Sequence, residues 1–113
     1  MMCKLTDTDF IVLSAIPKGK ENALFQKDLA SSLGMPKREF RWSVNHLRLS
    51  GVPICSSPEC GYWVADTMED VKEFIRFLNS YVASYMQTIQ RFTEVYENYD
   101  SVEEVLENVK LEK

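Results

Sequence analysis

The chain has 113 residues, of which 45% are hydrophobic and 27% charged, and its formal net charge is −4. These values are typical of one globular domain with an appendage. No run approaches the ~20 apolar residues that span a bilayer, and the N-terminus lacks the basic-then-apolar layout of a signal peptide, so we expect an intracellular, cytoplasmic protein with no membrane partner.

The first predicted helix begins near Thr6, which can cap it together with Asp9. The apolar segment "DFIVLSAI" continues this helix, and Pro17 and Gly19 end it. The residues that follow, "KGKENAL", are predicted to form a loop.

Two helices separated by a short glycine-containing turn come next. The second predicted helix covers residues 26–33, and Leu29 and Leu33 give it an apolar i, i+4 pair. Gly34 suits the end of this helix, and Pro36 suits the first turn of a third helix. Two helices with such a turn have the helix-turn-helix layout, which places the third helix in the reading position.

The third helix, from about residue 36 to residue 50, has two chemically different faces. Its buried stripe is predicted to be Phe40, Val44 and Leu47. The opposite face suits a DNA groove, because arginine bridges guanine edges or phosphates and asparagine pairs with adenine. The candidate DNA-binding residues are Lys37, Arg38, Arg41, Trp42, Asn45 and Arg48, of which Arg48 is expected to lie nearer the DNA backbone.

Two residues of this helix admit other roles. Trp42 can stack on a sugar or a base, but packing is favoured, either as an anchor for a protein partner or beneath the helix that follows the hairpin. His46, the only histidine, lies at the edge of the buried face, where we expect a structural role. Because no catalytic motif surrounds it and no glycine-rich phosphate loop occurs, we expect neither enzyme activity nor a cofactor.

The segments "VPIC" and "GYWVA" are short β-prone runs joined by "SSPEC", which predicts a β-hairpin. This joining loop holds no lysine or arginine, and its Glu59 would face phosphates unfavourably. We therefore expect this wing to contact DNA weakly, through Ser56 and Ser57 at most.

Three cysteines raise the question of a disulfide or a metal site. Cys55 and Cys60 flank the predicted turn, and only Cys3 and His46 could complete a zinc ligand set. The spacing matches no compact zinc pattern, and an odd, sparse set of cysteines is typical of reduced thiols. We interpret the cysteines as small, partly buried apolar residues, with no metal bound.

The charge is unevenly distributed along the chain. From Lys18 to Arg48 there are seven basic and three acidic residues, a net charge of +4. From Asp66 to Lys113 there are five basic and eleven acidic residues, a net charge of −6. Because distant charges are screened beyond about 8–10 Å at physiological salt, the basic island matters more for DNA contact than the net charge of the whole chain.

A long helix is predicted from residue 67 to about residue 99, capped by Thr67 and Asp70. Apolar residues recur along it in a near-heptad seam, in which Thr88 fills one position. The seam residues are Val71, Phe74, Leu78, Tyr81, Tyr85, Thr88, Phe92, Val95 and Tyr99, and the seam is widened by Ile75, Val82, Ile89 and Tyr96. This seam needs a partner surface, and we favour a dimer over a helix that breaks and folds back. The predicted dimerisation residues are Tyr85, Ile89, Phe92 and Tyr96. A separate short helix is predicted to begin at Ser101, which can cap it with Glu104.

The stretch "LASSLGMPKREFRWSVNHLRLSGVPICSSPECGYWVA" resembles the winged helix-turn-helix at the N-terminus of biotin-ligase-type repressors. It also resembles small winged-helix proteins of phages and prophages, in which a "GVPI…GYW" ending precedes a long helix. The resemblance covers roughly residues 6–65, and it implies DNA binding by the start and the exposed face of the third helix. It departs from the family at Pro36, where a serine is common, and residues 67–113 are predicted to be helical, a part for which the resemblance implies no activity.

Together these patterns predict a mainly α fold with a small β-hairpin: a winged helix-turn-helix domain over residues 1–66, followed by a long and a short helix over residues 67–113. We expect a phage- or prophage-type transcription regulator that binds double-stranded DNA as a homodimer. The alternative is a protein-interaction module that binds a host or replication protein without specific DNA binding.

Overall fold

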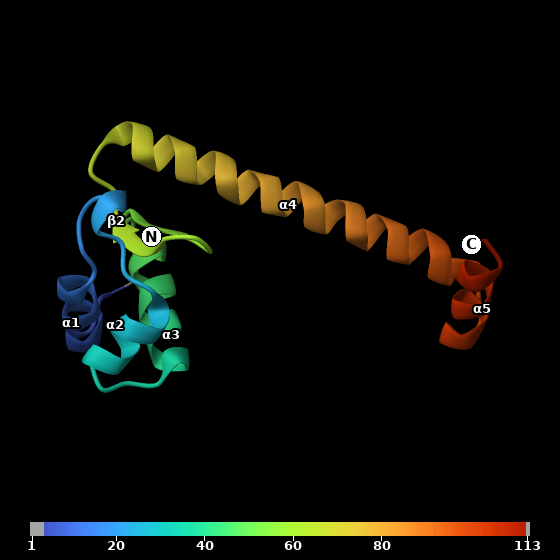
Figure 1. Ribbon diagram of the computed structural model, residues 1–113, viewed down its shortest axis with the longest axis horizontal. Coiled ribbons are helices and arrows are strands. Elements are labelled where there is room, and N and C mark those ends of the chain that lie inside the picture. The colour runs from blue at the N-terminus through green and yellow to red at the C-terminus, as the bar shows by residue number, and fades with distance from the viewer. Residues whose placement is uncertain (1–3, 113) are drawn as a thin grey trace. The chain divides into compact units, whose positions relative to one another are not determined.

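The computed structural model describes residues 4–112, with side chains as far as Asn108. Three helices, a hairpin, a long helix and a short helix follow one another along the chain (Figure 1), which confirms the predicted fold class. The elements are α1 (Asp7–Ala15), the 3-10 turn η1 (Lys20–Asn22), α2 (Gln26–Ser32), α3 (Lys37–Leu49), β1 (Ile54–Ser57), β2 (Gly61–Val64), α4 (Met68–Glu97) and α5 (Val102–Glu112).

The chain divides into two compact units. The first ends at Phe74 and the second begins at Ile75. We call the first unit the winged unit; it holds the elements from α1 to β2 together with the first turns of α4. Within residues 4–112, no helix combines the length and the apolar run that crossing a membrane requires.

The main core of the winged unit lies between α1, α2, α3 and the hairpin. The predicted stripe of α3 is buried, and Phe40 and Leu47 have no exposed surface. Phe40 also meets Tyr62 of β2 edge to face, with 5.3 Å between the ring centroids. The other buried apolar residues of this core are Val12, Ile16, Leu29, Ala30, Val44 and Ile54.

Local capping explains where α1 begins. The Asp9 N–H donates to Thr6 Oγ1 at 3.2 Å, and the Thr6 N–H donates to Asp9 Oδ2 at 2.9 Å. This reciprocal pair satisfies two backbone donors that the first helical turn leaves open, as the sequence predicted.

The turn between α2 and α3 depends on Gly34, which has a φ of +62°. The N–H of Gly34 donates to the Ser31 carbonyl, and the N–H of Met35 donates to the Ala30 carbonyl, both at 3.1 Å. Pro36 follows as the N-cap of α3 rather than as a member of its first turn. Its extended ψ of 148° lets the chain change direction before α3 begins.

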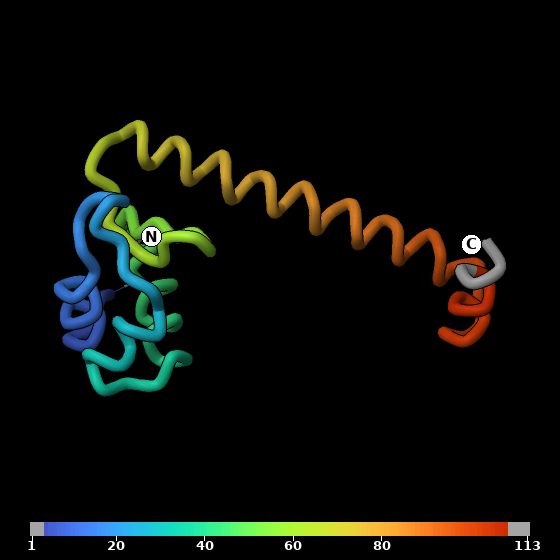
Figure 2. Tube along the Cα trace, in the orientation of Figure 1, coloured from blue at the N-terminus to red at the C-terminus, as the bar shows by residue number. Residues whose placement is uncertain are grey.

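The segment predicted as a loop after α1 pairs with the hairpin (Figure 2). β1 and β2 are antiparallel, with Ile54 opposite Val64, and the free edge of β2 then accepts this segment. The Tyr62 N–H donates to the Leu24 carbonyl at 2.7 Å, and the Leu24 N–H donates to the Tyr62 carbonyl at 3.1 Å. Gly61 permits this close approach, since a Cβ there would lie 2.3 Å from the Leu24 oxygen.

The start of α4 belongs to the winged unit. Thr67 caps the helix as predicted, because its Oγ1 accepts the Asp70 N–H at 3.1 Å. Val71 and Phe74, one turn further, pack against a second buried cluster made of Cys55, Trp63 and Ala65. The helix then continues without a break to Glu97.

A predicted separate helix, α5, follows α4. Its cap is the Ser101 hydroxyl, which accepts the Glu104 N–H at 3.2 Å. The Glu104 carboxylate in turn accepts the Asp100 N–H at 3.3 Å. This second capping pair confirms the predicted start at Ser101.

Candidate nucleic-acid interface

The outward face of α3 collects most of the predicted DNA-binding residues. Because Phe40, Val44 and Leu47 turn this helix toward the core, the residues on its other side are exposed. The exposed candidates are Lys37, Arg38, Arg41, Trp42 and Asn45. Four of these five side chains can donate several hydrogen bonds or carry positive charge, so the face can bind phosphates and base edges.

Trp42 is exposed rather than packed beneath α4, whereas the alternative that it anchors a protein partner stays a prediction. Its side chain is 61% exposed. The guanidinium carbon of Arg38 lies 4.5 Å from the centroid of the indole ring. This cation–π contact covers one face of the indole and orients Arg38 along the helix surface.

Arg48 lies apart from the other candidates. Its Nε donates to the Ile54 carbonyl at 2.8 Å, and its Nη2 donates to Ser56 Oγ at 3.1 Å. The guanidinium carbon also lies 5.1 Å from the ring centroid of Phe74 and 5.9 Å from that of Tyr62. Arg48 therefore connects α3 to both strands of the hairpin and to the first turns of α4.

A buried polar network links α1 to α3, and sequence reasoning did not identify it. Ser43 Oγ donates to Asp9 Oδ1 at 2.6 Å, and His46 Nδ1 lies 2.5 Å from Asp9 Oδ2. Asp9 is only 3% exposed, and its burial opposes ionisation. The hydrogen bonds from Ser43, Thr6 and His46 outweigh burial and lower the pKa of Asp9 to about 2. The structural role expected for His46 is confirmed.

A shallow pocket of about 350 Å³ opens beside this network, on the side of α3 that faces the start of α1. Its lining combines an exposed indole, a free carboxylate at Glu39 and several hydroxyls. The lining residues are Thr6, Thr8, Asp9, Glu39, Trp42, Ser43 and His46. This acidic, aromatic flank is chemically unlike the cationic face of the same helix and does not suit phosphate.

The tip of the hairpin is the turn between Ser57 and Gly61. The Cys60 N–H donates to Ser57 Oγ at 3.1 Å, which fixes the turn from within. Glu59 at the tip is exposed, and no basic residue lies between residues 49 and 65. The wing thus offers no cation to a phosphate backbone.

The hairpin cysteines are free thiols in the structure. Cys55 is buried against Trp63, and this burial raises the pKa of its thiol, although the Arg48 charge acts in the opposite direction. The interpretation of Cys55 as a small buried apolar residue is confirmed. Cys3 lies outside the described residues, and within residues 4–112 no three His, Cys, Asp or Glu side chains gather as metal ligands.

The predicted dimerisation residues form a second candidate surface on α4. Tyr85, Ile89 and Phe92 are between 61% and 65% exposed, and Tyr96 is 44% exposed. Since large apolar side chains contribute about 1.5–3 kcal/mol each when buried, this surface is unusual for a helix that stays in water.

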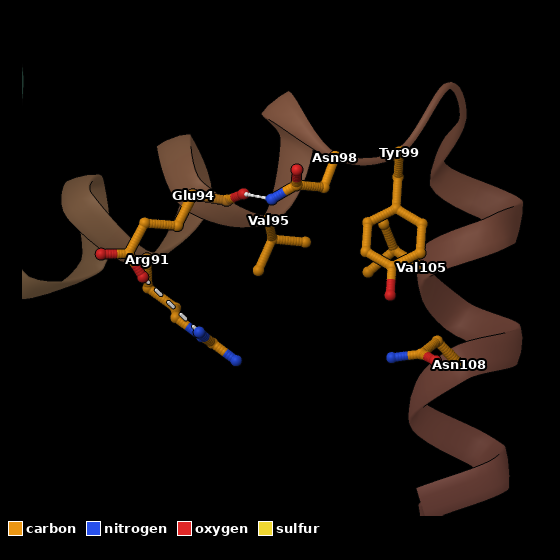
Figure 3. Close-up of a pocket in the computed structure, with 7 residues that line it drawn as sticks. All are labelled: Arg91, Glu94, Val95, Asn98, Tyr99, Val105 and Asn108. Carbon is orange, nitrogen blue, oxygen red and sulfur yellow. Dashed lines mark hydrogen bonds and ion pairs between the residues drawn. The ribbon is translucent and has the colours of Figure 1, made fainter.

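The end of α4 and α5 enclose an open pocket of about 420 Å³ (Figure 3). Its apolar part consists of Val95, Tyr99 and Val105. Its polar rim is already engaged, because Asn98 Nδ2 donates to the Glu94 carbonyl at 2.8 Å and Arg91 lies 3.6 Å from the Glu94 carboxylate. No buried charged group lines this pocket, so it offers no chemistry of its own.

Comparison of the chain with protein-family models, curated proteins and solved structures gave no match.

Proposed function

We propose that this chain is a double-stranded DNA-binding protein, a small transcription regulator of the phage or prophage type, which acts as a homodimer and needs no cofactor. One observation carries the proposal. The outward face of α3 presents Lys37, Arg38, Arg41 and Asn45 to solvent, in the basic part of an otherwise acidic chain.

In this proposal α3 enters the major groove with its outward face toward the bases. Asn45 and Arg41 lie one turn apart on that face, where asparagine can pair with adenine and arginine with guanine. Lys37 and Arg38 lie at the start of the helix and neutralise phosphates at the groove edge. Trp42 holds Arg38 in place through the cation–π contact.

Arg48 takes an indirect role within this proposal. Its contacts with Ile54, Ser56 and Phe74 commit most of its guanidinium to the winged unit. It holds the hairpin against α3 and so positions the reading helix, rather than contributing a phosphate contact of its own.

Dimerisation supplies the affinity that one winged unit lacks. A wing without cations and a single reading helix provide few phosphate contacts, so one copy should bind weakly. Two copies joined through Tyr85, Ile89, Phe92 and Tyr96 would present two reading helices to one duplex.

The test is a titration of a random-sequence duplex with the full chain at two salt concentrations. Fluorescence anisotropy of the duplex reports the binding. Three cationic side chains per protomer predict a slope of log affinity against log salt of about −3, doubled for a dimer. Selection from a randomised duplex pool then tests for sequence preference. Absence of binding even at low salt, or an affinity that ignores salt, would refute the proposal.

A second candidate function is a protein-interaction module, which the acidic pocket beside Trp42 favours. Glu39 and the exposed indole suit a cationic side chain of a partner protein rather than DNA. In that case Trp42→Ala would abolish binding to the partner, and the duplex titration would show no complex.

A further inference from the structure

The centre of α4 carries no charge on any side. Residues 77–90, "FLNSYVASYMQTIQ", form four helical turns without a lysine, arginine, aspartate or glutamate. All of them except Phe77 are exposed in the protomer. Such a stretch requires a partner surface that buries it, because helices that stay exposed depend on charged residues for solubility.

A lipid surface does not fit this stretch. Helices that lie in a membrane interface are rich in lysine and arginine on the polar face, where they meet anionic head groups. Here the polar face consists of Asn79, Ser80, Gln87 and Gln90, and the residues beyond it are mostly acidic. A protein surface of the same uncharged kind is the better complement.

The stretch is complementary to itself when it is reversed. The seam residues are symmetric about a point between Met86 and Gln87. Reversal of the helix about this point places Tyr85 on Thr88, Tyr81 on Phe92 and Leu78 on Val95. Each of these layers combines one a position with one d position, as antiparallel helix pairs do.

We propose that, in the homodimer on which the proposed function rests, the two α4 helices pair antiparallel, with Tyr85 of one copy opposite the partner's Thr88. The occupant of the apolar face of α4 is thus a second copy of this chain in reversed direction.

Side-chain volume favours this direction over a parallel pair. A parallel, in-register pair would place Tyr85 against the partner's Tyr85 and Thr88 against the partner's Thr88. A layer with two large side chains would then lie next to a layer with two small ones. The antiparallel pair matches one large with one small residue in both layers, which fills space evenly. Thr88 suits a buried seam, because its hydroxyl already donates to the Ser84 carbonyl at 3.2 Å.

Charge favours the same direction. In the last turns of α4, residues 91–97, each chain has one basic and two acidic residues. A parallel pair would bring two such segments side by side, and like charges across a helix interface are destabilising. In the antiparallel pair residues 91–97 lie beside residues 76–82 of the second copy, in which Arg76 is the only charged residue.

Disulfide cross-linking of the full chain tests the direction. The double variant Leu78→Cys/Val95→Cys is oxidised gently, and the linked peptides are identified by mass spectrometry. The antiparallel pair predicts a linkage of residue 78 to residue 95 between chains, with the linked dimer enriched at least tenfold over either single variant. Wild-type protein under the same oxidant is the control for linkage through its native cysteines.

The outcomes separate this inference from the proposed function. Links of residue 78 to 78 and of 95 to 95, in the double or the single variants, would overturn the antiparallel direction while leaving a dimer. A wild-type dimer by light scattering with no engineered link would overturn it as well. A wild-type monomer would refute the dimer itself, whereas loss of duplex binding with the 78-to-95 link intact would refute only the DNA-binding function.

Discussion

The Asp9 carboxylate and the Ser43 hydroxyl meet at 2.6 Å in the interior of the winged unit and so tie the first turn of α1 to the middle of α3. Asp9 has two tasks at once, since its other oxygen caps α1 through the Thr6 N–H. The position of α3 relative to α1 thus depends on one ionised carboxylate.

This carboxylate should make stability depend on acid pH. Its pKa is lowered from the ordinary 3.8 to about 2 in the folded chain, so between these values the unfolded chain binds more protons. The free energy of unfolding should therefore fall by about 2 kcal/mol as pH drops from about 4 to about 2. Urea denaturation at several pH values measures this, with Asp9→Asn as control. If the free energy of unfolding fell equally steeply between about pH 4 and about pH 2 in both proteins, the prediction would be contradicted.

Asn45→Ala should relax sequence preference and cost about 1–3 kcal/mol at a single base position, because a bidentate contact to adenine would be lost. The measurement is a set of anisotropy titrations with the selected duplex and its single-base variants. Lys37→Ala is the matched control, since a lost phosphate contact should weaken all duplexes about equally. Uniform weakening by both substitutions would mean that α3 positions the protein without specifying sequence.

Arg48→Met should destabilise the winged unit by about 2 kcal/mol, because methionine keeps an apolar chain but cannot donate to Ile54 and Ser56. Arg38→Met is the contrast: Arg38 is exposed, so that substitution should change stability by less than about 0.5 kcal/mol while it weakens DNA binding. Thermal denaturation and duplex titration of both variants give the two readouts. Equal stability of the two variants would show that Arg48 is not a structural connector.

Gly61→Ala should be among the most damaging single-methyl additions. Gly61 has a φ of +93°, and the new Cβ would lie 2.3 Å from the Leu24 carbonyl oxygen, which is backbone and cannot yield cheaply. We expect a loss of more than about 3 kcal/mol. Gly34→Ala is the control, with a φ of +62° and open space around the new methyl group, and should lose only about 1 kcal/mol. Similar losses at both sites would contradict the pairing of the residue 24 segment with β2.

Ile89→Glu with Phe92→Glu should dissociate the proposed dimer, since unpaired carboxylates buried in its seam would cost several kcal/mol. The variant should remain folded, because the core around Phe40 and Leu47 lies elsewhere. Light scattering and circular dichroism measure the two properties, and Gln87→Glu with Gln90→Glu gives the same charge change on the polar face. A variant that unfolds would show instead that Ile89 and Phe92 belong to the protein's own core.

Helix starts and the buried stripe of α3 could be predicted because their determinants are local. Thr6, Thr67 and Ser101 each act on residues within the next turn, and a 3.6-residue period places Phe40 and Val44 on one face. The exposed polar face of α3 followed from the same period.

Contacts between distant parts of the chain escaped prediction. The Asp9 bond to Ser43 spans 34 residues, and the pairing of Leu24 with Tyr62 depends on how the chain returns to the hairpin. The helical position of Arg48, beside the exposed face, groups it in the sequence with the candidate DNA-binding residues. Its commitment to Ile54 and Phe74 depends on where the hairpin and α4 lie. The only available hint of the buried network was that Ser43 and His46 share one side of α3.

Val71 and Phe74 of α4 pack on Trp63, and this contact limits where the winged unit could be cut if it were transferred to another protein by recombination. A transplanted segment that stopped at Asp66 would leave the cluster around Trp63 open and Arg48 without its aromatic neighbour on α4. Recombination that keeps this module functional must therefore carry at least two turns of α4 with it. Those turns set the helical phase of the part of α4 that follows, so the winged unit and the rest of α4 are inherited with a fixed helical phase.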